Sequence, residues 1–150
     1  MKYLLDTCFV SELSKPAPDV GALAWFDSVP EENLYLSAMS VGEIRFGIER
    51  LPEGPKKMQL SEWFDELLRA YTNSLFSVDR SVTDLWGKER ARLTAEGKTP
   101  GVVDALIACT AITNEAVLVT RNSGDFEGFR VKLLNPWSGG TGSSILAPEA

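Results

Sequence analysis

The chain has 150 residues, and its content of 44% hydrophobic and 24% charged residues is ordinary for a single globular domain. It contains no histidine, which excludes catalytic triads that use an imidazole base and also the usual zinc sites. Its 21 acidic and 15 basic residues give a net charge of −6, which argues against broad electrostatic binding of nucleic acid but not against a local basic rim. Any hydrolysis must therefore use carboxylates, a metal, lysine or tyrosine.

The sequence carries no targeting signal that we recognise. No apolar run approaches the roughly 20 residues that span a bilayer, and the first acid, Asp6, comes too early for a secretory signal peptide. We therefore expect a cytoplasmic protein. The two cysteines, Cys8 and Cys109, are too few for a disulfide framework or a zinc pair, and we expect both to behave as small hydrophobic residues.

The first predicted element is a short apolar strand over residues 2–5, typical of a buried parallel strand. A helix follows, with Thr7 as its candidate cap, until prolines interrupt it. The pattern then predicts a helix over residues 19–28, a strand over 34–37 and a helix from about residue 40 to the breaker at 52–55. The apolar, core-facing positions of this third helix are Val41, Ile44, Phe46, Ile48 and Leu51.

The second half of the chain continues the alternation. An amphipathic helix is predicted over residues 56–71, with Met58 in its apolar stripe, and a strand over 75–78. Further helices are predicted over 79–96 and 102–114, and further strands over 117–120 and 130–134. Because Gly and Ser are frequent from residue 138 onward, we expect residues 138–150 to form a flexible C-terminal tail.

Alternating strands and helices predict an α/β fold, a three-layer α/β/α sandwich with a mainly parallel central sheet, over residues 1–137. In such folds, ligands bind beyond the carboxyl ends of the strands. Asp6 directly follows the first strand, and Asp125 follows the strand over 117–120 by a short turn. We therefore expect both carboxylates at that edge of the sheet.

Four acidic residues are candidates for one site at this edge: Asp6, Glu43, Asp104 and Asp125. Hard divalent cations such as magnesium prefer oxygen ligands. Four carboxylates gathered without a cation would repel one another, so their convergence would indicate a metal. Taken singly, each acid has an ordinary alternative as a helix cap, a first-turn acid or an Asx-turn residue.

The context of the four acids is more specific than any one of them. It comprises Leu4-Leu5-Asp6-Thr7, Ser40-x-x-Glu43 leading to Gly47, Asp104-Ala105-Leu106-Ile107-Ala108 and Val119-Thr120-Arg121-Asn122-x-x-Asp125-Phe126. In this order, the motifs resemble those of the PIN-domain nucleases. More narrowly, they are similar to the VapC-type toxins of type II toxin–antitoxin pairs, including the FitB-like branch.

The resemblance implies an endoribonuclease that depends on magnesium or manganese, in which water activated by the metal hydrolyses RNA to 5′-phosphate and 3′-hydroxyl ends. Asp6 and Asp104 match the most direct metal ligands, and Glu43 and Asp125 would complete the site directly or through water. The polar residues expected to orient carboxylates or waters are Thr7, Thr120 and Asn122. Arg121 and Arg45 are candidates for contacts with RNA phosphates.

The resemblance also implies partners. We expect a cognate antitoxin, a small DNA-binding protein whose C-terminal segment occupies a hydrophobic groove of the toxin. The chain is expected to pair as a homodimer, to form a hetero-oligomer with the antitoxin, and to meet operator DNA only through it.

Two other interpretations stay open. A phosphoaspartate protein also has an aspartate after its first strand, but the haloacid-dehalogenase-like motif needs a second aspartate where this chain has Cys8. Alternatively, the chain serves as a binding partner in a DNA-binding toxin–antitoxin repressor complex, with little nuclease activity of its own. Intact acids do not distinguish this role from catalysis.

Overall fold

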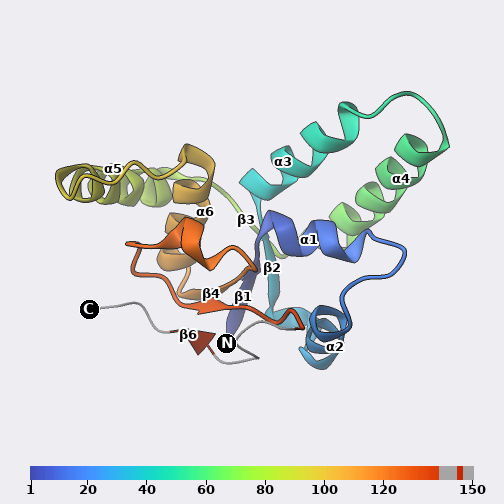
Figure 1. Cartoon of the computed structure of the whole chain (residues 1–150), viewed down its shortest axis with the longest axis horizontal. Coiled ribbons are helices and arrows are strands. Elements are labelled where there is room, and N and C mark those ends of the chain that lie inside the picture. The colour runs from blue at the N-terminus through green and yellow to red at the C-terminus, as the bar shows by residue number, and fades with distance from the viewer. Residues whose placement is uncertain (139–144, 147–150) are drawn as a thin grey trace.

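The computed structural model describes residues 1–138 and 145–146. Within these residues, helices and strands alternate as expected (Figure 1). The strands are β1 (Lys2–Leu5), β2 (Leu34–Ser37), β3 (Leu75–Phe76), β4 (Ala116–Val119), β5 (Leu133–Leu134) and β6 (Ile145–Leu146). The helices are α1 (Thr7–Leu13), α2 (Val20–Ser28), α3 (Ala38–Glu49), α4 (Pro55–Ala70), α5 (Arg80–Ala95) and α6 (Val102–Thr113), with short 3-10 helices η1 (Glu31–Asn33) and η2 (Ser123–Phe126).

The strands form one sheet in the order β3-β2-β1-β4-β5-β6. The first five are parallel to their neighbours, and β6 is antiparallel to β5. From β1 the chain builds outward through β2 and β3 on one side, and later through β4 and β5 on the other. The gap beyond the carboxyl ends of β1 and β4 is therefore the topological switch point, where ligands of open α/β sheets bind.

Helices cover both faces of the sheet, which confirms the predicted three-layer α/β/α sandwich with its mainly parallel sheet. Side chains alternate between the faces along each strand. In β1, Leu5 packs into a core with α1, α2, α3 and α4, whereas Leu4 packs into a second core with α5 and α6. In β4, Val119 and Leu118 divide in the same way. Because both faces are covered, β4 is buried at every position.

Helix starts agree with the expected capping chemistry. Asp19 and Asp79 cap α2 and α5 by accepting hydrogen bonds from the Ala22 and Val82 amides at 2.9 and 3.1 Å. The helix α3 begins at Ala38, earlier than predicted, because the Ser37 hydroxyl accepts a hydrogen bond from the Met39 amide at 3.1 Å. Its hairpin with α4 extends beyond the sheet (Figure 1).

Two predicted core positions and one strand are wrong. Phe46 and Met58 are 59% and 64% exposed. Phe46 lies on the face of α3 opposite the buried row of Ile44 and Ile48, and Met58 lies near the start of α4, whose buried residue is Phe64. The final parallel strand, predicted over residues 130–134, is limited to β5, where Leu133 and Leu134 pair with Leu118 and Val119 of β4.

The predicted tail over residues 138–150 falls largely outside the described residues. Within it, the Ser138 amide donates a hydrogen bond to Asp19 Oδ2 at 2.8 Å, and Ile145–Leu146 pair with β5 as β6. In the described part of the chain, every helix is too short or too polar to cross a bilayer.

A buried carboxylate joins α1 to the end of the domain. Glu12 is 4% exposed, and its Oε1 accepts hydrogen bonds from Lys15 Nζ at 2.9 Å and from Trp137 Nε1 at 3.2 Å. Its Oε2 accepts one from the Asp19 amide at 3.0 Å. The hydrogen bond from Lys15, which outweighs the effect of burial, lowers the pKa of Glu12.

Replacing Glu12 by alanine should destabilise the domain by about 2–4 kcal/mol, because the Trp137 indole and the Asp19 amide then lack an acceptor. Since the pKa of Glu12 is lowered on folding, its contribution is complete above the ordinary value of 4.5 and is lost as pH falls through the folded value. Urea denaturation of Glu12→Ala at neutral and acidic pH measures both effects. Glu66→Ala, at an exposed position of α4, is the control and should change little.

Candidate functional site

Asp6 lies at the switch point and both of its oxygens are held. Its backbone amide continues the sheet by donating to the Val119 carbonyl at 3.0 Å. Oδ1 accepts from the Thr7 amide and Oδ2 from the Thr120 hydroxyl, each at 2.8 Å. Asp6 rather than Thr7 is thus the cap of α1, and the carboxylate, 5% exposed, is oriented by residues from two strand ends.

Thr120 and its neighbours form the support of Asp6. The Asn122 amide donates to Thr120 Oγ1 at 3.0 Å, which leaves the hydroxyl proton for Asp6. Cys8 Sγ lies 3.5 Å from Asp6 Oδ2 and 3.4 Å from Thr120 Oγ1. Burial and then the charge of Asp6 raise the pKa of the Cys8 thiol, so the thiol stays protonated at neutral pH and donates to the carboxylate.

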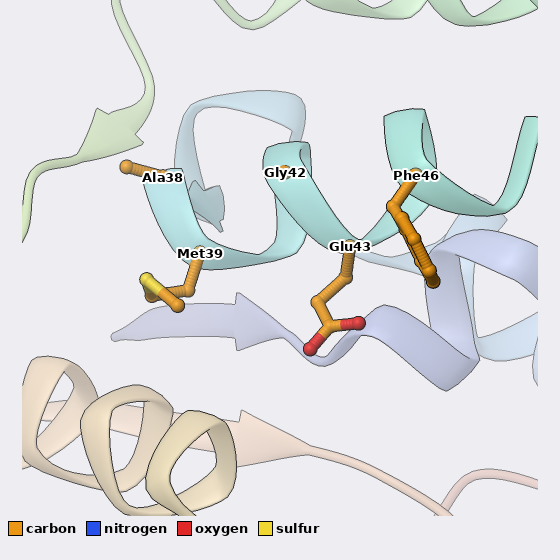
Figure 2. Close-up of a pocket in the computed structure, with 5 residues that line it drawn as sticks. All are labelled: Ala38, Met39, Gly42, Glu43 and Phe46. Carbon is orange, nitrogen blue, oxygen red and sulfur yellow. The ribbon is translucent and has the colours of Figure 1, made fainter. Parts of the chain in front are cut away.

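A second contact ties α1 to α3. The Thr7 hydroxyl donates to Ser40 Oγ at 3.0 Å, and Ser40 is buried in the first turn of α3. Glu43 follows Ser40 by one helical turn. Figure 2 shows its carboxylate pointing away from α3, toward the junction of β1 and α1 in this view. It opens into a pocket of about 270 Å³ that is lined by Ala38, Met39, Gly42, Glu43 and Phe46.

The other two acids come from the opposite half of the chain. Asp104 lies in the first turn of α6, and Asp125 lies in η2, after β4. Burial raises the pKa of Asp104 first, and the negative charges of Asp125, Asp6 and Glu43 raise it further. The pKa of Asp6 is also raised, mainly by burial. The hydrogen bonds from Thr120, Thr7 and Cys8 lower this pKa, and the charge of Asp125 raises it. The structure therefore brings Asp125, Asp6 and Glu43 within electrostatic reach of Asp104, and Asp125 within reach of Asp6.

The two arginines predicted to contact phosphate differ in their surroundings. Within the described residues, none of the four acids forms an ion pair with lysine or arginine. Arg121 is exposed next to Thr120, and its guanidinium lies 5.3 Å from the ring centroid of Trp137. Arg45 instead joins α3 to α4 by an ion pair with Asp65 at 2.6 Å and a hydrogen bond to Ser61 at 3.1 Å. Of the two arginines predicted to contact phosphate, Arg121 is the better placed.

The donor set fits a hard cation that keeps much of its own water. The acids and hydroxyls offer only oxygen ligands. The acids repel one another, and none of them has a cationic partner among the described residues. In the same part of the chain, no group of three or more His, Cys, Asp or Glu side chains is arranged to enclose a metal ion. The fit to a cation therefore rests on the chemistry of the donors, because magnesium binds oxygen and typically uses one or two carboxylates while it retains several waters.

Two further residues belong to the site. Ser40 begins the Ser40-x-x-Glu43 motif, but the sequence predicts no contact for it, although a serine one turn before Glu43 is the available signal. Cys8 is predicted to behave as a small hydrophobic residue that could lie near the site, because it follows Asp6 by two positions. The structure places its Sγ 3.5 Å from Asp6 Oδ2, whereas Cys109 is buried.

Comparison with known proteins agrees with this geometry. The PIN domain family matches residues 3–130. The VapC ribonuclease Y4jK of Sinorhizobium fredii is 34% identical over 135 residues, which cover 89% of this chain and 96% of the relative. Toxin FitB of Neisseria gonorrhoeae is 34% identical over 135 residues, or 89% and 97% of the two chains. A solved structure of FitAB bound to the IR36 DNA fragment superposes with a TM-score of 0.84 at 34% identity, covering 91% of this chain and 96% of that one.

Removing one charge from the cluster should stabilise the metal-free protein. Because the pKa of Asp104 is raised on folding, its ionised form costs folding free energy at neutral pH, and this cost disappears as pH falls below the ordinary value of 3.8. We expect Asp104→Asn to raise Tm at pH 7 in EDTA by roughly 3 °C, about 1 kcal/mol for a chain of this size, with the gain fading toward pH 4.

Thermal unfolding in EDTA across this pH range measures the effect. Asp84→Asn is the matched control, since Asp84 is exposed on α5 beside Lys88, remote from the cluster. A loss of stability in Asp104→Asn at pH 7 would show that the acids do not repel one another as described.

Proposed function

The chain belongs to the PIN-domain family, and we propose that it is a magnesium- or manganese-dependent endoribonuclease, the toxin of a toxin–antitoxin pair that acts in the cytoplasm. One observation carries the proposal: Asp104 lies close enough to Asp125, Asp6 and Glu43 for their charges to add to the effect of burial in raising its pKa, and these acids have no cationic partner among the described residues. Relatives named VapC ribonuclease and Toxin FitB support the same activity over nearly the whole chain.

Asp6 and Asp104 would hold the cation most directly, with Glu43 and Asp125 contributing directly or through water. When bound, the cation would activate water for attack on an RNA phosphodiester and stabilise the charge that develops on phosphate oxygens. A metal suits this chain because no histidine is available as a general base.

The protein's own groups prepare the site. Thr120 and the Thr7 amide fix the Asp6 carboxylate, so that little reorganisation is needed when the ligand binds. Glu43 is held by a helix whose first turn is joined to α1 through Ser40 and Thr7. Arg121 would contact phosphate oxygens, which a chain of net charge −6 otherwise repels.

We also propose the partners that this function requires. The cognate antitoxin, a small DNA-binding protein, would cover apolar surface of the toxin, and the toxin would pair as a homodimer. The candidate antitoxin surface includes Val20 and Leu23 of α2, which are 80% and 37% exposed. Operator DNA would be reached only through the antitoxin. The solved structure of FitAB bound to a DNA fragment supports this arrangement. It equally supports the second candidate function, in which the chain is part of a DNA-binding repressor complex and has little nuclease activity.

Cleavage of RNA should require both the metal and the acids. We expect Asp6→Asn and Asp104→Asn to lower activity by well over 100-fold. Thr120→Val removes the hydrogen bond that orients Asp6 and also the acceptor of the Asn122 amide, and we expect it to lower activity by about 10–100-fold. The measurement is cleavage of structured RNA by the purified, antitoxin-free chain with Mg²⁺, Mn²⁺ or EDTA.

Asp84→Asn, at an exposed position of α5, should cleave RNA at the wild-type rate. Equal activity of Asp6→Asn, Asp104→Asn and the wild type would refute the assignment. A folded wild type that cuts no RNA with either metal would favour the repressor role.

Toxicity should depend on the neighbouring gene. If the chain is a toxin, its expression alone should arrest growth, and co-expression of the small protein encoded immediately upstream should restore it. Colony counts with the chain alone, with both proteins and with Asp104→Asn measure this. Growth arrest that persists with the upstream protein, or that is as strong in Asp104→Asn, contradicts the proposal.

A further inference from the structure

One face of α3 carries an exposed aromatic side chain beside Glu43. Met39, Glu43 and Phe46 project from the same side of the helix (Figure 2) and line the pocket described above. Residues at this spacing are neighbours on a helix surface, with Cβ atoms about 5–6 Å apart. Phe46 is 59% exposed, although large aromatic side chains are more often used to fill a core.

The core does not account for this ring. The buried row of α3 consists of Ser40, Ile44 and Ile48, and it faces the opposite way. Phe46 is absent from both hydrophobic cores of the described residues. Gly42 adds no side chain, and a Cβ built there would meet no atom within 4 Å, so the pocket stays open at this wall.

A cation continues the same face. Arg50 follows Phe46 by one turn, and its guanidinium lies 5.3 Å from the centre of the Phe46 ring. In the described part of the chain, Arg50 forms no ion pair with a carboxylate, whereas the neighbouring Arg45 and Lys57 are both paired. Arg50 is exposed, so its charge is accessible to an anion.

The thioether of Met39, the carboxylate of Glu43, the ring of Phe46 and the guanidinium of Arg50 thus follow one another along a single helix face. The ring and the guanidinium match two parts of a nucleotide chain, because aromatic rings stack on unpaired bases and arginine binds phosphates. We propose that Phe46 is the stacking platform for a nucleobase beside the scissile phosphate, with Arg50 contacting a neighbouring phosphate. This inference rests on the proposed ribonuclease function and names the substrate as RNA with an unpaired base at the cut.

The unpaired state follows from the geometry of stacking. A ring at the mouth of a pocket offers a base one open face, and a base inside an A-form helix has no free face to offer. Stacking on Phe46 would also be tolerant of sequence, because every base has such a face. The ring would therefore select exposed loop or single-stranded positions rather than a particular base.

The test compares a short, mixed-sequence, fluorescein-labelled single-stranded RNA with an abasic ribose-phosphate chain of the same length. Binding is measured by fluorescence anisotropy in the Asp104→Asn full-length chain, which would hold RNA without cutting it. Phe46→Ala should weaken binding of the base-bearing RNA about tenfold and leave binding of the abasic chain unchanged. Phe46→Leu should behave like alanine, and Phe46→Trp should retain the affinity, because stacking needs an aromatic face.

Met58→Ala is the control, since Met58 is similarly exposed but lies on α4 and does not line the pocket. It should leave the affinity for both RNAs unchanged. Circular dichroism establishes that each variant is folded.

The inference is overturned if Phe46→Ala weakens both RNAs equally or neither. It is also overturned if Phe46→Ala leaves RNA binding intact but dissociates a dimer in analytical ultracentrifugation, because the ring is then a protein contact. If the wild type still cleaves RNA in these cases, the proposed ribonuclease function stands and only the role of Phe46 is refuted. If the wild type neither binds nor cleaves RNA with Mg²⁺ or Mn²⁺, both the proposed function and the role of Phe46 are refuted.

Discussion

The hydrogen bond between Thr120 and Asp6 is the contact on which the candidate site depends. It joins residues 114 positions apart in the chain, and it exists only because β1 and β4 are adjacent and end at the same level. The sheet order brings the hydroxyl to the carboxylate, and the cap of α1 holds the other oxygen. A buried carboxylate with both oxygens fixed is a rigid point around which the other three acids are arranged.

The same arrangement sets stability against function. Burial and like charge raise the pKa values of Asp6 and Asp104, so the ionised acids cost folding free energy at neutral pH, a cost that the proposed cation would offset. Glu12 shows the opposite use of a buried carboxylate. Its three hydrogen-bond donors lower its pKa, and it joins α1 to Trp137, over which Arg121 lies. Glu12, which stabilises the fold, therefore lies only six residues after Asp6, whose ionised carboxylate destabilises it.

The α3–α4 hairpin contributes in two ways. Its base lies against the sheet and carries Ser40 and Glu43 to the site, whereas its outer part exposes Phe46 and Met58. Arg45 is used to join the two helices through Asp65, and Arg50 is left on the face of Phe46. Arg45 is therefore occupied by a contact within the hairpin, whereas Arg50 is free of an ion pair among the described residues and can contact an anion.

The sequence by itself determined the order of the elements, the α/β class and the identity of the four acids. These features are local: apolar periodicity, capping residues and turn residues act over a few positions, and most predicted bounds agree with the structure within two residues. The absence of histidine is also a property of composition, and it favours a metal over an imidazole base.

Only the tertiary structure decided which groups meet. The contacts of Thr7 with Ser40 and of Thr120 with Asp6 depend on strand order, which no local pattern encodes. Apolar residues between Val41 and Leu51 occur on more than one side of α3, and only the packing shows that Ile44 and Ile48 face the core, which leaves Phe46 on the opposite face. The last strand is shorter than its side-chain pattern predicts, because only Leu133 and Leu134 pair with β4 as strand residues. Contacts between distant residues are set by the packing of whole elements, and for that reason they appear only in the folded chain.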